Sequence, residues 1–220
     1  MKRISQSLWI LLVSLCLSAA AAAQDAQDNG LANAILEIQH QWEHIHYQIP
    51  EDRQDAAFPQ LEDSVDALIK RYPKHAEPLV WKAIVLSTHA GVKGGLSALS
   101  MVRRARDLLE QAEKIDPDTL NGSIYTTLGS LYYQVPGWPL GYGDDKKAAT
   151  FLKKALQINP NGIDANYFYG DFLYRKGQYS EALSVLEKAM HAPARPNRPL
   201  ADEGRRKEIQ AVIAKIKDKT

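Results

Sequence analysis

The chain has 220 residues, enough for one or two ordinary domains and too few for a large multidomain enzyme. Its 27 Lys and Arg residues nearly balance its 26 Asp and Glu residues, so the composition gives no general attraction to nucleic acid or to an anionic membrane. The composition therefore argues against binding to nucleic acid or to an anionic membrane through net charge, and it does not define a function.

The N-terminal 23 residues have the composition of a secretory signal peptide. Lys2 and Arg3 form a basic start, residues 8–17 are mainly apolar, and residues 19–23 are all alanine. The apolar run of about ten residues is shorter than the roughly 20 that a membrane-spanning helix needs. We therefore expect export and cleavage before Gln24, with no integral membrane segment in the mature protein.

Cleavage at this position would leave 197 residues with a formal charge of −1 and no cysteine. Disulfides, thiol nucleophiles and Cys-ligated zinc are then excluded, and an apolar core must hold the fold together. Lipid attachment at Cys16 is the alternative. Leu15 argues against it, because this residue is larger than the small one that is typical before a lipid-modified cysteine.

Three segments of the chain repeat one pattern. Each has alanine, leucine four positions later and alanine three positions after that, with proline downstream. These spacings place the three residues on one helical face, where alanine allows close approach of a neighbouring helix and proline ends the pattern. The segments are Ala105-Leu109-Ala112 with Pro117, Ala148-Leu152-Ala155 with Pro160, and Ala182-Leu186-Ala189 with Pro193 and Pro196.

A second helical pattern precedes each alanine face, with Gly129 or Gly170 in the middle of the later two. This order of helix, turn, helix and proline resembles the tetratricopeptide repeat (TPR), and the match is best over residues 166–189. The resemblance implies an all-α solenoid of about four helical pairs, over about residues 31–73, 77–117, 121–160 and 163–193.

A further helix is expected after the repeats. Ile209, Val212 and Ile216 recur at helical spacing and predict a capping helix over about residues 200–218 that covers the last pair. Arg205, Arg206 and Lys207 make this segment basic. We expect these side chains to face solvent, and an acidic partner is the alternative.

The helical pairs differ in the length of their internal connection. The interval from the mid-helix small residue to the next alanine face is 12 residues in the last pair, 19 in the third and 22 in the second. We expect the extra residues to form loops on one edge, with Gly91–Gly95 beside Val135–Gly143. The first pair also has a long predicted connection, Ile49–Pro59.

The loop that begins at Val135 is the first candidate binding site. Trp138 and Tyr142 supply large amphipathic side chains, and Asp144 is placed to cap the next helix. Two interpretations stay open: Trp138 folds back over the edge of the core, or the loop docks a partner or ligand.

The inner groove of the solenoid is the second candidate. Polar and aromatic side chains of the third and fourth pairs are expected there, which suits a peptide or protein segment. Whether they bind a partner or only solvate the groove stays open. These residues are Thr126, Ser130, Tyr133, Gln134, Tyr167, Asp171, Tyr174 and Arg175.

One pattern suggests an enzyme. His40, Glu43 and His44 match the H-x-x-E-H arrangement of inverzincin metalloproteases. Those enzymes are much larger and need a further acidic ligand. We therefore predict a helix with its histidines on the wet side and Trp42 packed, and we predict no catalytic residues, metal or cofactor.

The stretches 122–139, 143–148 and 166–173 resemble exported TPR proteins of Gram-negative bacteria. Part of the pattern is similar to the T-component of TRAP solute transporters. The resemblance implies a periplasmic location and a protein or peptide partner. The leading hypothesis is therefore a periplasmic scaffold. The alternative is a transport-accessory module that binds a small molecule or a solute-binding protein, and a zinc hydrolase is the remote one.

Overall fold

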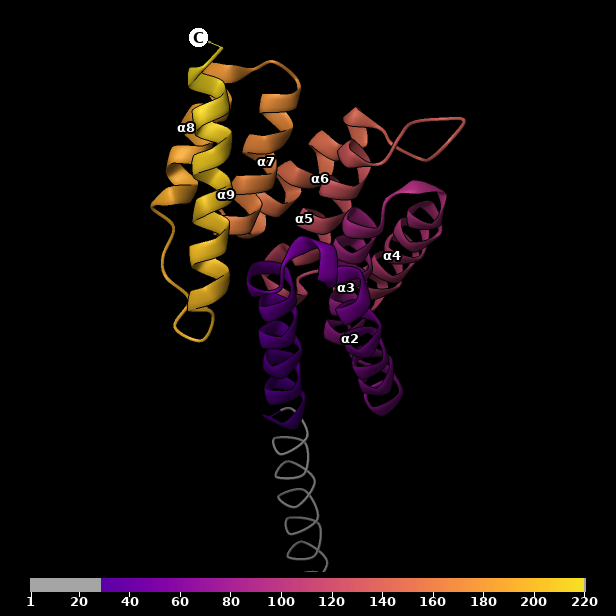
Figure 1. The fold of residues 1–220 in the computed structure, drawn as a ribbon. Helices are drawn as coiled ribbons and strands as arrows, with labels where there is room; N and C mark the ends of the chain where they lie inside the picture. The colour runs from indigo at the N-terminus through magenta and orange to yellow at the C-terminus, as the bar shows by residue number, and fades with distance from the viewer. Residues whose placement is uncertain (1–28, 220) are drawn as a thin grey trace, which may run out of the picture. The chain divides into compact units, whose positions relative to one another are not determined.

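The computed structural model describes residues 29–219, and this range is helical without any strand (Figure 1). A first helix covers residues 29–48. The predicted signal peptide, Cys16 and Gln24 lie outside the described residues. The further helices are α2 (Glu51–Arg71), α3 (Glu77–Lys93), α4 (Gly95–Ile115), α5 (Thr119–Gln134), α6 (Asp145–Ile158), α7 (Ile163–Arg175), α8 (Tyr179–Met190) and α9 (Pro199–Lys217). No helix among the described residues is long and apolar enough to cross a membrane.

The chain divides into two compact units, residues 1–37 and 38–220. Of the first unit, only residues 29–37 are described, and they are helical. The second unit is built from antiparallel neighbours: α3 packs on α4, α5 on α6, and α7 on α8. The all-α fold that the repeated pattern predicts is therefore confirmed.

The small residues of the pattern lie where the paired helices approach each other. A Cβ atom on Gly129 would lie 2.6 Å from the Cγ of Leu152, and one on Gly170 would lie 2.6 Å from the Cγ of Leu186. The alanines of all three faces are completely buried. Glycine on the first helix of a pair thus makes room for leucine on the second.

The helix α9 covers the last pair, as expected for a capping helix, by packing on both α7 and α8. The segment that leads into it also contacts the beginning of the second unit. Arg198 forms an ion pair with Glu43, and the backbone carbonyl of Asn197 lies 2.8 Å from His40 Nε2. The two ends of the second unit therefore meet, and this closure was not predicted.

The predicted loop Ile49–Pro59 is wrong. The helix α2 begins at Glu51 and continues through Pro59, which lies on the exposed side, where the carbonyl that loses its hydrogen bond remains accessible to water. The buried Gln54 side chain donates to the carbonyl oxygen of Ile49 at 2.9 Å and so satisfies a group at the preceding helix end.

The predicted loop at Gly91–Gly95 is also wrong. The helix α3 runs to Lys93 and α4 begins at Gly95, so the additional residues lengthen the helices. Only Gly94 separates them, with φ of 62°, a conformation that a residue with a side chain rarely adopts.

Candidate functional site

The α5–α6 loop, residues 135–144, is fixed at its base by backbone hydrogen bonds. The amide of Gly143 donates to the carbonyl of Pro136 at 3.0 Å, and the amide of Asp144 donates to that of Tyr132 at 2.8 Å. The Asp144 carboxylate accepts from the amides of Lys146 and Lys147, as the predicted helix cap requires. The loop is thus an ordered element.

Tyr142 is the aromatic residue that attaches this loop to the core. Its hydroxyl donates to the carbonyl of Val102 on α4 at 2.8 Å, and its ring packs edge-on against Tyr132. The Arg106 guanidinium lies 4.7 Å from the ring centroid. Burial raises the pKa of the Tyr142 phenol above its ordinary value, so the hydroxyl remains a donor at neutral pH.

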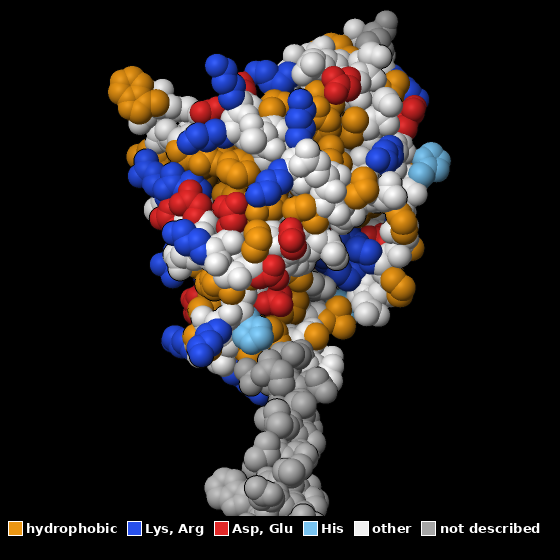
Figure 2. Space-filling model, turned by 180° about the vertical axis from the view of Figure 1, so that it is seen from behind, with side chains coloured by type: hydrophobic (Ala, Val, Ile, Leu, Met, Phe, Trp, Pro, Cys, Tyr) orange, Lys and Arg blue, Asp and Glu red, His pale blue; other side chains and the backbone are white. Residues whose placement is uncertain are grey.

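Trp138, in contrast to Tyr142, does not pack on the core. Its side chain is 90% exposed, and Leu140 beside it is 60% exposed. The loop projects from the surface in Figure 1, and its tip carries hydrophobic side chains in Figure 2. The interpretation of Trp138 as a lid over the core edge is therefore wrong.

The α5–α6 loop was predicted to lie beside a loop at Gly91–Gly95, but it contacts the helix α4 instead. The side chain of Arg103 donates to the carbonyl of Leu140 at 3.3 Å, so the α5–α6 loop contacts the second pair on α4, at Val102 and Arg103. These contacts lie about two turns beyond Gly95. The second pair has no loop of its own on this edge, because its additional residues are helical.

Four of the predicted groove residues form one cluster. The Tyr133 hydroxyl donates to Asp171 Oδ2 at 2.8 Å, and Arg175 Nε donates to the same oxygen at 2.9 Å. Burial, with Asp171 close by, raises the pKa of Tyr133 well above its ordinary value. Gln134 in turn donates to the Tyr133 hydroxyl. These side chains join α5 to α7 and satisfy one another.

The other predicted groove residues lie elsewhere. Tyr167 packs beneath the guanidinium of Arg205, 4.5 Å from its ring centroid, and Tyr174 packs near Tyr179. Thr126 and Ser130 line a central cavity, where each hydroxyl donates to a carbonyl of its own helix. The predicted groove set is thus divided among several places.

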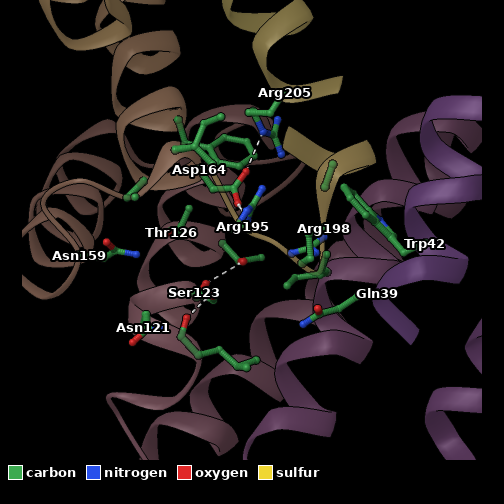
Figure 3. Close-up of a pocket in the computed structure, with 18 of the residues that line it drawn as sticks. Gln39, Trp42, Asn121, Ser123, Thr126, Asn159, Asp164, Arg195, Arg198 and Arg205 are labelled. Atoms are coloured by element: carbon green, nitrogen blue, oxygen red, sulfur yellow. Dashed lines mark hydrogen bonds and ion pairs between the residues drawn. The ribbon is translucent and has the colours of Figure 1, made fainter. Parts of the chain in front are cut away.

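The central cavity lies within the second unit, and Figure 3 shows part of its lining. Its volume is about 470 Å³. Its walls come from the first helix, α3, α5, α7 and α9, and from the segment 193–198. Gln39, Asn121, Asn159 and Arg198 are seen around the space in Figure 3.

An ion network forms one wall of the cavity. Asp164 accepts from Arg195 and from Arg205, at 2.8 Å each, and Arg195 also pairs with Asp202 at 2.6 Å. Arg205 pairs further with Glu208. Burial opposes ionisation of Asp164, but the three nearby arginines outweigh it and lower the pKa of this carboxyl.

The inverzincin pattern does not assemble into a metal site. The Glu43 carboxylate is buried against Arg198, whereas His40 and His44 are exposed and contact the Asn197 carbonyl and the Gln48 side chain. No group of three or more potential ligands is placed to hold a metal within the described range. The expectation of exposed histidines and a packed Trp42 is correct.

Comparison with known proteins shows what the helical pairs are similar to. Residues 140–202 match a family model described as "Tetratricopeptide repeat". The matched stretch is therefore similar to tetratricopeptide repeats. The crystal structure of TTC0263, a thermophilic TPR protein of Thermus thermophilus, is similar to it with a TM-score of 0.52 and 14% sequence identity, over 73% of this chain and 91% of that one. At this identity the similarity shows the fold alone. No curated protein matches the chain significantly.

The residues that close the helical array were missed in the sequence. Arg205 was expected in solvent and is 8% exposed. A usable indication existed: Arg205 precedes Ile209 by four positions and Val212 by seven, so it lies on the apolar face of α9. Nothing in the sequence places Arg195 and Arg198 against Asp164 and Glu43, because these contacts join segments far apart in the chain.

Proposed function

We propose that the protein is a TPR interaction scaffold whose α5–α6 loop docks a partner protein. The observation that supports this is the exposed Trp138 at the tip of a loop with a fixed base. A large apolar side chain in water is unfavourable, and an aromatic anchor on an ordered element is typical of interaction hot spots. In helical-repeat proteins, insertions that form loops on one face often mark the binding face.

The surroundings of the loop indicate the chemistry of the partner. Arg103 and Arg106 contact the loop from α4, and Lys147 lies 5.2 Å from the ring centroid of Tyr132 at its base. Figure 2 shows Lys and Arg side chains beneath the projecting tip, with Asp and Glu side chains among them. We expect an apolar pocket bordered by acidic side chains on the partner.

A photo-crosslinking residue at position 138 tests the docking function in cells. It should capture a defined protein, and the same residue at Ile115, which is 44% exposed near the other end of α4, should not. With the captured protein purified, Trp138→Ala should weaken binding by about 2 kcal/mol or more, or roughly 30-fold, while helical content is unchanged. Wild-type affinity in this variant would refute the proposal.

We further propose export to the periplasm. The basic start, the apolar run and the alanines of residues 1–23 support it, together with the resemblance to exported Gram-negative TPR proteins. Intact-mass measurement of the cellular protein should give a chain that begins at Gln24. A lipid-modified Cys16, or a chain that begins at Met1, would contradict this.

A second candidate function is a transport-accessory module, in line with the similarity to the T-component of TRAP transporters. The central cavity favours it, because a volume of about 470 Å³ is in the range of small-molecule sites. Denaturing extraction of the purified protein followed by mass spectrometry tests it. A compound present at one per chain would support this function, and a chain without one would contradict it.

A further inference from the structure

A groove lies between the helices α2 and α4, which are labelled in Figure 1. Within the described residues both helices pack on α3 and not on each other, which leaves a space above α3. The groove has a volume of about 820 Å³, and it shares no lining residue with the central cavity. On α4 it extends from Ser100 to Gln111, which is about 17 Å at 1.5 Å per residue. The groove is thus about as long as three turns of a helix.

The floor of the groove is apolar. Leu79 on α3 and Leu108 on α4 belong to the core and are 8% and 7% exposed, and Ile69 on α2 is half-buried. Apolar side chains at the base of a groove between two helices suit the apolar stripe of a further helix. A peptide that binds as an added strand needs a sheet edge, and residues 29–219 contain no strand. The groove therefore fits a helix better than an extended segment.

The rim of the groove carries positive charges that the protein does not neutralise. Lys70 stands on the α2 side, and Arg103 and Arg104 stand on the α4 side. All three residues are exposed, and none of them forms an ion pair with another described residue. Arginine is enriched at protein interfaces, where its guanidinium pairs with carboxylates.

Two carboxylates also line the groove, but each is paired with a cation outside the rim. Asp66 lies 3.0 Å from the buried Lys82 ammonium, and Asp107 lies 2.7 Å from the Arg106 guanidinium. The three rim cations therefore remain uncompensated on both sides of the apolar floor. This arrangement is complementary to a ligand with acidic side chains on both sides of an apolar stripe.

We propose that the α2–α4 groove binds an acidic amphipathic helix of the partner that docks on the α5–α6 loop. The apolar side chains of this helix lie on the floor, and its carboxylates pair with Lys70 on one side and with Arg103 and Arg104 on the other. The groove is continuous with the loop, because Arg103 lines the groove and donates to the carbonyl of Leu140. The inference rests on the docking function for the identity of the partner.

A single-stranded nucleic acid is a poorer match for this groove. Proteins that bind such strands combine positive charge with aromatic side chains on which the bases stack. None of the described residues that line the groove is aromatic. The apolar floor consists of aliphatic side chains, which suit leucine or isoleucine on a helix.

Two synthetic peptides of about 14 residues test the groove on the purified protein by fluorescence anisotropy. Both have leucines at helical spacing, flanked by glutamate in one peptide and by lysine in the other. The glutamate peptide should bind at one per chain, at least about tenfold more tightly than the lysine peptide, and its affinity should fall as salt is added. Equal binding of the two peptides, no binding, or displacement by a single-stranded oligonucleotide would overturn the proposal.

Charge reversal on the rim provides the sharper test. Lys70→Glu and Arg104→Glu should each weaken binding of the glutamate peptide at least about fivefold and keep the wild-type melting temperature, because both side chains are exposed and unpaired. Lys153→Glu is the matched control: this lysine is exposed on α6, forms no ion pair with another described residue and lies outside the groove. It changes the net charge equally and should alter the affinity less than about twofold. Wild-type affinity in Lys70→Glu and Arg104→Glu, or an equal loss in Lys153→Glu, would refute the site.

The same variants separate the groove from the loop. Trp138→Ala should bind the glutamate peptide like the wild type, because the peptide occupies the groove alone. Capture of a protein through position 138, with no effect of rim charge on peptide binding, would leave the docking function and remove the groove. Charge-dependent peptide binding without any capture through position 138 would have the reverse meaning. Sedimentation of the protein alone should show a monomer, and a dimer that Arg104→Glu dissociates would place a second copy in the groove and overturn the proposal.

Discussion

The α5–α6 loop and the closure at α9 distribute their side chains in opposite ways. The loop places Trp138 in water at 90% exposure, whereas the closure buries Glu43 at 2% and Arg205 at 8%. An apolar residue outside and charged residues inside both depart from the usual distribution. Trp138 can stay exposed because Tyr142 and the backbone hydrogen bonds at the base already order the loop. The charged residues of the closure can be buried because they form ion pairs with one another.

The difference shows which region the fold depends on. A buried charge is tolerated only while its partners are present, so removal of one member leaves another uncompensated. Removal of an exposed side chain at a loop tip leaves no buried group without a partner, so it changes the stability of the fold little. We therefore expect mutations at the closure to act on stability and mutations at the loop tip to act on binding.

The largest effect is expected at Arg205. Arg205→Ala should lower the free energy of unfolding by about 3 kcal/mol, because it removes a buried guanidinium and leaves Asp164 and Glu208, whose side chains are 33% and 28% exposed, without this partner. Lys207→Ala, two positions along the same helix and highly exposed, should change it by less than about 0.5 kcal/mol. Urea unfolding followed by circular dichroism measures both, and equal effects would show that the network does not stabilise the closure.

The next effect depends on pH and on Asp164. Its lowered pKa means that its contribution to stability is complete above the pKa of the unfolded chain, about 4, and is lost as the pH falls further. At pH 7, Asp164→Asn should be about 1–3 kcal/mol less stable than the wild type. The difference should shrink as the pH is lowered below about 4. A constant difference from pH 7 to pH 3 would contradict the ionised state of Asp164.

Within the loop, the base should be more sensitive than the tip. A Cβ atom on Gly143 would lie 2.0 Å from the carbonyl oxygen of Val135, so Gly143→Ala must displace backbone and should cost about 1–3 kcal/mol. Gly137→Ala in the same loop is the matched control, since its nearest neighbour would be 3.5 Å away. Thermal unfolding of the two variants should differ clearly, and similar melting temperatures would mean that the base is not rigid.

The smallest effect on stability is expected at the tip. Trp138→Ala should change the free energy of unfolding by less than about 0.5 kcal/mol, because the side chain is already in water. Differential scanning calorimetry measures the change. A fall of several degrees in the melting temperature would show that Trp138 supports the fold, and would weaken the contrast between loop and closure.

The sequence was most informative where spacing and residue size act locally. The alanine faces at helical intervals predict which helices pair, and Gly129 and Gly170 lie where the paired leucines need space. It was misleading at Pro59 and Gly91, which suggested loops and lie in helices. A proline on an exposed helical face loses one hydrogen bond that water replaces, and the apolar spacing on the buried face outweighs it.

For the candidate sites, the sequence identified the loop and missed the cavity. The aromatic, proline and glycine content of residues 135–144 is visible in one continuous segment, but whether Trp138 or Tyr142 folds inward is not. Tyr142 folds inward because its hydroxyl donates to the backbone carbonyl of Val102 on α4, about 40 residues earlier in the chain. The cavity has no local pattern, because its walls come from several helices and from the connecting segment 193–198.

The sequence by itself determined most of the helices, the pairing within α3 to α8 and the position of the capping helix, because each depends on the periodic arrangement of residues within about 40 positions of one another. Only the tertiary structure decided that α9 returns to the first helix, that Arg198 and Trp81 share a cavity, and that Trp138 stays in water. The physical reason is distance along the chain: Glu43 and Arg198 are 155 positions apart, and a charge or an indole N–H carries no indication of the partner that folding brings to it.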